Sequence, residues 1–128
     1  MHLASEKPPL QVVFCHCGDC KRWTGAPAPA FAAFKDDASL WSPDMGAGVE
    51  TNAGIRRWNC PSCASPIAAT FHYIPGQIYV PLGVIDQGAD LPAEFHCHGE
   101  HEWSSLCIKD GTPRHTGTAS DTLNEAGQ

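Results

Sequence analysis

Residues 14–25 read FCHCGDCKRWTG and hold three cysteines within six positions, Cys15, Cys17 and Cys20. Thiols this close can all reach one metal ion, because a Zn–S bond is only about 2.3 Å long. A disulfide within so short a run would be strained, since bridged Cα atoms must lie roughly 4.4–6.8 Å apart in a set geometry. The pattern therefore predicts three thiolates on one ion, zinc by preference, with the fourth tetrahedral position open as in catalytic zinc sites.

The composition fits one small enzyme or metal-binding domain. The chain has 128 residues, enough for a single buried core, and a net charge of −6. This acidic balance argues against nucleic acid or an anionic membrane surface as the main partner. Because no stretch of about 18 apolar residues is present, the sequence predicts no membrane span.

The seven cysteines bear on the redox compartment. The N-terminus, MHLASEKPP, has no basic segment followed by an apolar run of roughly 7–15 residues, so we expect no signal peptide. We therefore expect a cytoplasmic, reducing location. Clustered cysteines indicate metal binding or catalysis there, rather than disulfides.

Short β-rich runs separated by proline and glycine predict an all-β fold without long helices. The expected strands are residues 10–14, 30–35, 39–42, 49–52, 55–59, 66–73, 77–82, 95–98, 103–108 and 114–115. Residues 20–25 are expected to form a helical turn. We expect an extended lead-in at 1–11, where two prolines exclude a helix, and a polar, poorly packed tail at 116–128.

A second cysteine pair follows in Cys60-Pro-Ser-Cys63, the C-P-x-C knuckle that is common in zinc sites. On spacing alone, this pair and Cys17–Cys20 can make one closed four-cysteine structural zinc, which needs no catalysis. Two features weigh against that arrangement. The 39 residues between Cys20 and Cys60 exceed the usual zinc-ribbon separation, and Cys15 would have no role.

Four segments together resemble the glutathione-dependent formaldehyde-activating enzyme family, which includes the centromere-protein-V-like proteins. They are CHCGDCKRWTGAPAPAFAAF, RRWNCPSCASPI, VPLGVIDQGADLPAEFH and a final W-x-x-L-x-I-x-DG-x-P, within residues 12–115. The resemblance implies a β-tent fold of short, zinc-pinned antiparallel sheets over 12–115. It also implies carbon–sulfur lyase chemistry, in which formaldehyde condenses with the glutathione thiol to S-hydroxymethylglutathione, and the reverse.

The resemblance also implies roles for the cysteines. In the family the C-x-C-x-x-C run, here Cys15, Cys17 and Cys20, holds the catalytic zinc. The later C-x-x-C, here Cys60 and Cys63, belongs to a separate structural zinc. Family members usually begin with a G-x-C-x-C-G segment that supplies the other two structural ligands, and no cysteine precedes the first motif here.

The second metal site is therefore expected to be incomplete, because a structural zinc takes four ligands and the knuckle supplies two. Several sources of a missing pair are open: Cys97 or Cys107, His96 or His98, a second chain, or a segment upstream of this chain. Strand alternation gives Cys97 no neighbour, and Cys107 lies in a different predicted strand, so we expect the pair to be absent. Ala64 also stands where the family has glycine.

Other polar residues near the first motif have two interpretations each. They can orient a substrate or move protons, but each is more often a solvated surface side chain. They are His16, Asp19, Lys21, Arg22 and Thr24.

Three further features of the sequence have less specific signals. Asp86 either supports a metal ligand or forms a turn. On a strand, His96 and His98 would share one face and Cys97 the other. The tryptophans are expected in the core and at its rim: Trp23, Trp41, Trp58 and Trp103.

Two functions of different classes remain. The first is a zinc lyase acting on the adduct of a small-molecule thiol, such as glutathione, with an aldehyde. Zinc deprotonates a bound thiol, and a three-thiolate site is too negative to acidify water well, which favours thiol transfer over hydrolysis. The second is a non-catalytic, zinc-stabilised β module that binds a partner. An open three-thiolate site supports the first and a closed Cys₄ site the second, and the oligomeric state stays open.

Overall fold

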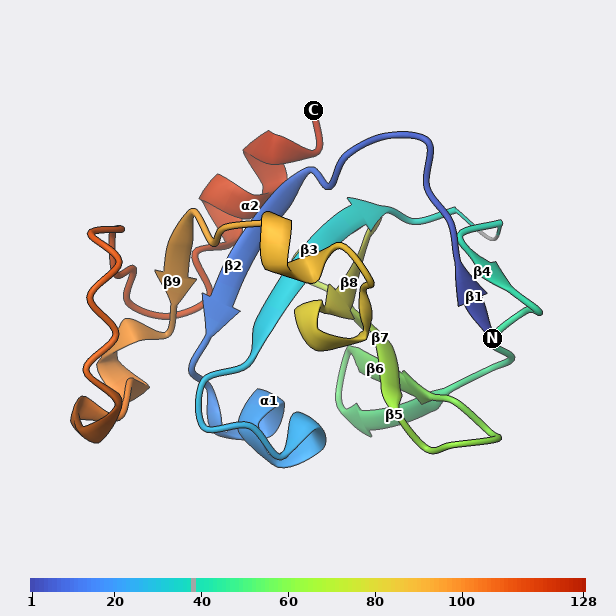
Figure 1. The fold of residues 1–128 in the computed structure, drawn as a ribbon, viewed down its shortest axis with the longest axis horizontal. Helices are drawn as coiled ribbons and strands as arrows, with labels where there is room; N and C mark the ends of the chain where they lie inside the picture. Colours follow the sequence, from blue (N-terminus) through green and yellow to red (C-terminus); the bar gives the residue numbers. More distant parts are fainter. Residues whose placement is uncertain (38) are drawn as a thin grey trace.

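The computed structural model describes residues 1–37 and 39–128. Over these residues, seven strands form one mixed sheet in the order β5-β6-β7-β8-β3-β2-β9, and β1 and β4 form a separate pair (Figure 1). The strands are β1 His2–Leu3, β2 Gln11–Cys15, β3 Ala30–Lys35, β4 Trp41–Ser42, β5 Val49–Asn52, β6 Ile55–Asn59, β7 Pro66–Phe71, β8 Gln77–Pro81 and β9 Phe95–Cys97.

Neighbouring strands of the large sheet run antiparallel except for β2 and β9, which are parallel. The parallel pair sets Cys15 opposite Cys97 at the ends of both strands. The mostly β fold expected from the sequence is confirmed. The lead-in is less simple than expected, because His2 and Leu3 pair with Ser42 and Trp41 as β1 and β4.

The core has two parts, one on each face of the sheet, because successive side chains of a strand point to opposite faces. On the face that we call the α2 face, Val13, Phe31, Phe71 and Tyr79 pack with Cys20. The other face, here the β4 face, is packed by a separate apolar set. Its members include Val12, Phe34, Trp41, Cys60, Ile67 and Ile78.

The described helices are all short. They are α1 Gly18–Thr24, α2 Ser120–Ala126 and the 3₁₀ helices η1 Leu82–Val84, η2 Gly88–Asp90, η3 Gly99–His101 and η4 Ser104–Leu106. The longest have seven residues, which confirms the expectation of no long helix over residues 1–37 and 39–128. In this part of the chain, no helix has the length and apolar character to cross a membrane.

The C-terminal tail was wrongly expected to be poorly packed. Leu123 of α2 is 3% exposed and joins the core of the α2 face. The Gln77 side chain donates a hydrogen bond of 2.7 Å to the Leu123 carbonyl, and Asn124 donates one of 2.9 Å to the Tyr73 carbonyl. The polar C-terminal segment is therefore held by the buried Leu123 side chain and by these two hydrogen bonds.

The prediction of a strand at residues 103–108 is also wrong, because the 3₁₀ helix η4 occupies the centre of this segment. Trp103 is 52% exposed, so no buried face favours an extended strand there. Ser104 and Ser105 favour a turn, and Cys107 has a left-handed φ of 51°, which ends the segment. The strand expected at 114–115 is reduced to a single parallel bridge between Arg114 and His96.

Candidate metal centre

The three cysteines of the first motif lie where a strand turns into a helix. Cys15 ends β2, and Cys17 is the N-cap residue of α1. The Cys17 sulfur accepts a hydrogen bond of 3.4 Å from the Cys20 backbone N–H, so a thiol takes the place that serine or aspartate usually has at a helix start. Gly25, with a φ of 72°, ends the helix. The expected helical turn at 20–25 is thus α1, and it begins two residues earlier.

This arrangement brings the three sulfurs of Cys15, Cys17 and Cys20 together, within 4.8 Å of one another. The Cys15 and Cys17 sulfurs are 3.5 Å apart. Two sulfurs on one tetrahedral zinc lie about 3.8 Å apart, given Zn–S bonds of about 2.3 Å. Cys20 is fully buried while Cys15 and Cys17 are half-buried, so the cluster is reached from one side. Three converging soft donors fit a thiophilic ion such as zinc.

Hydrogen bonds among the three sulfurs shift the pKa values of Cys15 and Cys17 in opposite directions. The hydrogen bonds with the Cys15 thiol and then the Cys20 thiol lower the pKa of Cys17 to about 2. The contact with Cys17 raises the pKa of Cys15 well above its usual value. An ion that binds all three sulfurs as thiolates must displace the proton that the raised pKa favours on Cys15.

A buried arginine that no sequence pattern singled out lies against this cluster. Arg57 of β6 is 3% exposed, and its Nη2 donates to the Cys20 sulfur at 3.7 Å. Its guanidinium lies 4.7 Å from the centre of the Trp23 ring and 5.7 Å from that of Phe71. In the sequence, Arg57 simply follows Arg56 and nothing distinguishes the two. Its burial beside Cys20 is what distinguishes it in the structure.

A small cavity of about 20 Å³ lies beside the sulfurs on the α2 face, room for about one water molecule. Its walls are mostly apolar. They include Cys15, Cys20, Phe31, Tyr73, Tyr79, Cys97 and His98. A small uncharged molecule, rather than an ion with a hydration shell, fits such a space next to the thiols.

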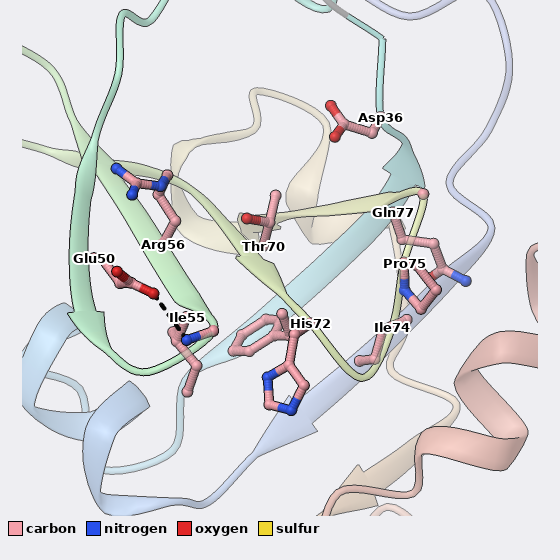
Figure 2. Close-up of a pocket in the computed structure, with 12 residues that line it drawn as sticks. Asp36, Glu50, Ile55, Arg56, Thr70, His72, Ile74, Pro75 and Gln77 are labelled. Atoms are coloured by element: carbon pink, nitrogen blue, oxygen red, sulfur yellow. Dashed lines mark hydrogen bonds between the residues drawn. The ribbon is translucent and has the colours of Figure 1, made fainter.

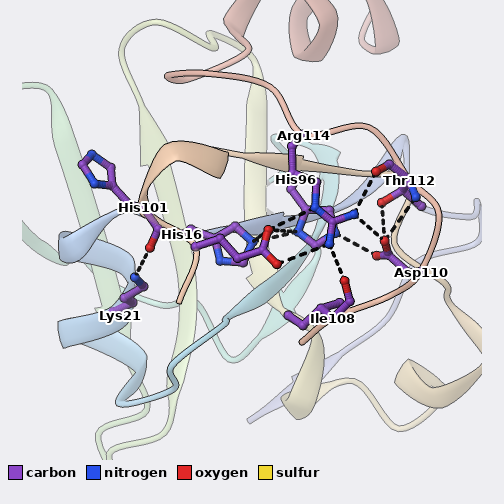
Figure 3. Close-up of polar contacts among 9 residues, drawn as sticks. His16, Lys21, His96, His101, Ile108, Asp110, Thr112 and Arg114 are labelled. Carbon is purple, nitrogen blue, oxygen red and sulfur yellow. Dashed lines mark hydrogen bonds and ion pairs between the residues drawn. The ribbon is translucent and has the colours of Figure 1, made fainter. Parts of the chain in front are cut away.

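His16 does not lie on the surface, although a solvated side chain was the commoner expectation for it. It is fully buried, and its Nε2 lies 2.7 Å from His96 Nδ1. His96 Nε2 in turn lies 2.8 Å from the Asp110 carboxylate, so two buried histidines lead to an exposed carboxylate (Figure 3). These contacts tie the segment between Cys15 and Cys17 to the C-terminal part of the domain.

An arginine holds the two carboxylates beside these histidines. Arg114 donates to Glu102 at 3.0 Å. It also donates to Asp110 at 2.8 Å (Figure 3). The Arg114 hydrogen bond lowers the pKa of Glu102. Burial works to raise the pKa of Asp110, but hydrogen bonds from His96, Thr112 and Arg114 outweigh it and hold that pKa well below its usual range. Sequence reasoning missed Glu102 and Arg114, because they meet only through the fold.

His96 and His98 do not share a face, so that prediction is wrong. β9 ends at Cys97, and His98 takes a left-handed φ of 53° that turns its side chain out of the alternation. His98 therefore lies 3.4 Å from Glu100 and lines the small cavity. Cys97 is 3% exposed and lines the same cavity.

The remaining polar residues of the first motif have structural roles. Asp19 and Arg22 form an ion pair of 2.7 Å in which the Arg22 side chain is 77% exposed, as expected for a solvated face. Lys21 donates to a backbone carbonyl of η3 at 2.6 Å. The Thr24 hydroxyl donates to the Cys20 carbonyl at 2.8 Å, within α1.

The second cysteine pair has a different environment. Cys60 is 7% exposed in the core of the β4 face, whereas Cys63 is exposed, with its sulfur 3.2 Å from the Ser65 hydroxyl. Backbone hydrogen bonds close the turn, from Ala64 to the Cys60 carbonyl and from Cys60 to the Ser65 carbonyl. Over residues 1–37 and 39–128, no group of three metal-ligating side chains includes either cysteine. Ala64 adopts a left-handed φ of 65°, a conformation that glycine takes without strain.

The other candidate ligands for that pair lie elsewhere. Cys97 is in the core of the α2 face, across the sheet from Cys60. Cys107 is exposed, and its sulfur lies 3.4 Å from the Ser104 carbonyl. Asp86 is exposed between η1 and η2, which fits a turn residue.

A larger open pocket of about 240 Å³ lies between β6, β7 and the turn after Phe71 (Figure 2). Its polar walls include Asp36, Glu50, Arg56 and His72, and no cysteine lines it. This pocket is therefore separate from the centre at Cys15, Cys17 and Cys20.

Comparison with known proteins supports the family resemblance. The sequence model described as "Glutathione-dependent formaldehyde-activating enzyme" matches residues 1–104, which is most of the chain. The matched region includes both cysteine motifs, and it begins and ends earlier than the 12–115 expected from the motifs. A comparison with curated proteins gave no match.

Proposed function

This chain belongs to the glutathione-dependent formaldehyde-activating enzyme family, and we propose on that premise that it is a zinc-dependent carbon–sulfur lyase. It would form or cleave the adduct of a small thiol with an aldehyde, with glutathione and formaldehyde as the first candidates. The observation that carries the proposal is the convergence of three sulfurs within 4.8 Å at a half-exposed position. A cytoplasmic, reducing location is part of the proposal, because the thiols must stay reduced.

The reaction needs no oxidant. The thiol sulfur forms a bond to the carbonyl carbon, the C=O π bond breaks, and the thiol proton ends on the new hydroxyl oxygen. Cleavage runs the same steps backwards. A free thiol with a pKa of about 8.5 is only a few per cent ionised at pH 7, so the step gains most from a thiol that is already ionised and held still.

Cys15, Cys17 and Cys20 would hold the zinc. When bound, zinc would supply a positive centre that deprotonates an incoming thiol. The chain's own side chains would do the rest. Tyr73 and Phe31 narrow the cavity of about 20 Å³ and limit the water beside the sulfurs. The thiol would approach on the exposed side of Cys17.

The test is the rate of adduct formation from glutathione and formaldehyde by zinc-loaded protein, followed by NMR exchange spectroscopy. We expect a rate above the spontaneous reaction that falls to background in Cys17→Ser. The matched control is Cys107→Ser, which changes an exposed cysteine outside the cluster and should leave the rate unchanged. A wild-type rate equal to background for glutathione and for other small thiols would overturn the proposal in favour of a non-catalytic zinc module.

A further inference from the structure

Arg57 is a buried cation that the reaction described above does not use. It is 3% exposed, and its guanidinium is packed by Trp23 at 4.7 Å and Phe71 at 5.7 Å. Arginine stays charged in proteins, because its pKa is above about 12. Aromatic rings stabilise a cation only partly, so burial of this charge calls for a negative partner.

No carboxylate fills that role. Over the described residues, 1–37 and 39–128, Arg57 forms no ion pair with aspartate or glutamate. Its Nη1 is buried without a hydrogen-bond partner. Among the residues that the structure describes, its side chain makes one polar contact, from Nη2 to the Cys20 sulfur at 3.7 Å. The position differs from that of Arg56, which donates to the Ala47 carbonyl and lines the open pocket of Figure 2.

The cysteine cluster has the complementary charge. Three thiolates around one divalent ion carry a net negative charge, and Cys20, the sulfur nearest Arg57, is fully buried. A buried negative centre without a counter-charge would itself be costly. The arginine and the cluster are buried on the same face of the sheet. Each therefore offsets the free-energy cost of burying the other's charge.

We propose that Arg57 is the counter-charge of the Cys15–Cys17–Cys20 cluster, a positioning residue that raises the cluster's affinity for a divalent thiophilic ion. It acts by offsetting the negative charge of the loaded cluster and by fixing the Cys20 sulfur through Nη2. This inference rests on the proposed metal site and is independent of which thiol or aldehyde the protein uses.

The test measures zinc affinity by competition with a chromophoric chelator, in the full chain, for Arg57→Met and wild type. Groups that contact metal ligands typically change metal affinity by about 10–100-fold, so we expect Arg57→Met to bind zinc at least about tenfold more weakly. Arg57→Lys, which keeps the charge, should recover part of the loss. Arg56→Met, one residue away on the same strand, is the matched control and should bind zinc as wild type does.

A second readout separates charge from packing. Cobalt(II) in place of zinc gives sulfur-to-metal charge-transfer absorption, whose intensity reports bound thiolates. We expect Arg57→Met to need more cobalt to reach the wild-type intensity. Trp23→Leu removes one side of the guanidinium stack but keeps the charge, and it should lower the stability of the chelated protein more than the affinity for cobalt. If Arg57→Met does not fold, Arg57→Gln takes its place.

The outcomes decide the inference separately from the proposed function. Zinc and cobalt affinities of a folded, uncharged variant within about twofold of wild type would overturn the role of Arg57, whatever the lyase assay shows. A loss of affinity as large in Trp23→Leu as in Arg57→Met would also overturn it, in favour of packing alone. Weaker metal binding in Arg57→Met supports the inference even if wild type shows no lyase activity. Failure of wild type to bind zinc overturns both the metal site and the role of Arg57.

Discussion

The two cysteine knuckles share the C-x-x-C spacing but lie on opposite faces of the sheet. Cys17 and Cys20 lie with a third sulfur and a buried guanidinium on the α2 face. Cys60 is packed as a core residue of the β4 face, and Cys63 points to solvent beside Ser65. The C-x-x-C spacing therefore determines only that the chain turns at each motif. Whether the turn can hold an ion depends on what the rest of the fold brings to it.

The local backbone adds to this difference. The first knuckle begins α1, where Cys17 accepts a backbone N–H and is held in one orientation. The second is a turn closed by its own backbone hydrogen bonds, which involve Ala64 and Ser65. A turn that is satisfied in this way keeps its shape without an ion.

The largest expected effect separates the two knuckles by substitution. Cys17→Ser should lower zinc affinity by about a hundredfold or more and abolish adduct formation, because a hydroxyl is a poor zinc ligand at neutral pH. Cys63→Ser, the matched change in the second knuckle, should leave zinc affinity and activity unchanged. Metal analysis of the two dialysed proteins checks this. Equal zinc loss from both variants would contradict the separation.

The next largest effect concerns the packing of helix α2 on the α2 face of the sheet. Leu123 of α2 is 3% exposed on the α2 face, so Leu123→Ala should destabilise the protein by about 2–5 kcal/mol. The control Val49→Ala, at a side chain that is 65% exposed, should change stability by less than about 0.5 kcal/mol. Urea unfolding of the chelated proteins gives both values. An unchanged midpoint in Leu123→Ala would show that α2 is not part of the core.

A smaller effect tests whether Cys60 acts as a core residue. Cys60→Ala removes a buried sulfur from the β4 face and should cost about 1–2 kcal/mol. The same loss is expected with excess zinc and with a chelator, because the cost comes from packing. Denaturant unfolding under the two conditions measures it. A loss that is large in zinc and vanishes in chelator would mean that Cys60 binds an ion.

The smallest effect depends on pH and concerns the segment of the first knuckle, where His16 is linked through His96 to Asp110. The folded-state pKa of Asp110 is lowered, so its contribution to stability is present above the unfolded pKa of about 3.9 and is lost as pH falls through the lower, folded value. Asp110→Asn should be less stable than wild type at neutral pH, and the gap should close in acid. Urea unfolding from pH 7 to pH 2.5 measures it. A gap that is constant over this range would contradict the role of the carboxylate.

Local patterns predicted much of the fold. The strands at Ala30–Lys35, Val49–Asn52 and Ile55–Asn59 have the expected bounds, since each is a β-rich run between turn residues. The convergence of Cys15, Cys17 and Cys20 is also a local matter, and the sequence predicted it. Errors occur where distant contacts decide the structure, as when Leu123 anchors a polar tail.

The neighbours of the candidate site could not be read from the sequence for the same reason. His16 meets His96 across 80 residues of chain and Arg57 meets Cys20 across 37. No spacing rule connects such pairs. A charged or titratable residue next to a cysteine motif is more often solvated, and only the burial of His16 and Arg57 shows that these are exceptions.

The most direct test of the account is the zinc content of the zinc-loaded, dialysed chain, combined with X-ray absorption at the zinc edge. We predict one zinc per chain with three sulfur neighbours at about 2.3 Å and a lighter atom completing the shell. Two zincs per chain, or one zinc with four sulfur neighbours, would contradict the claim that Cys15, Cys17 and Cys20 form the metal centre and that the Cys60 turn stands without one.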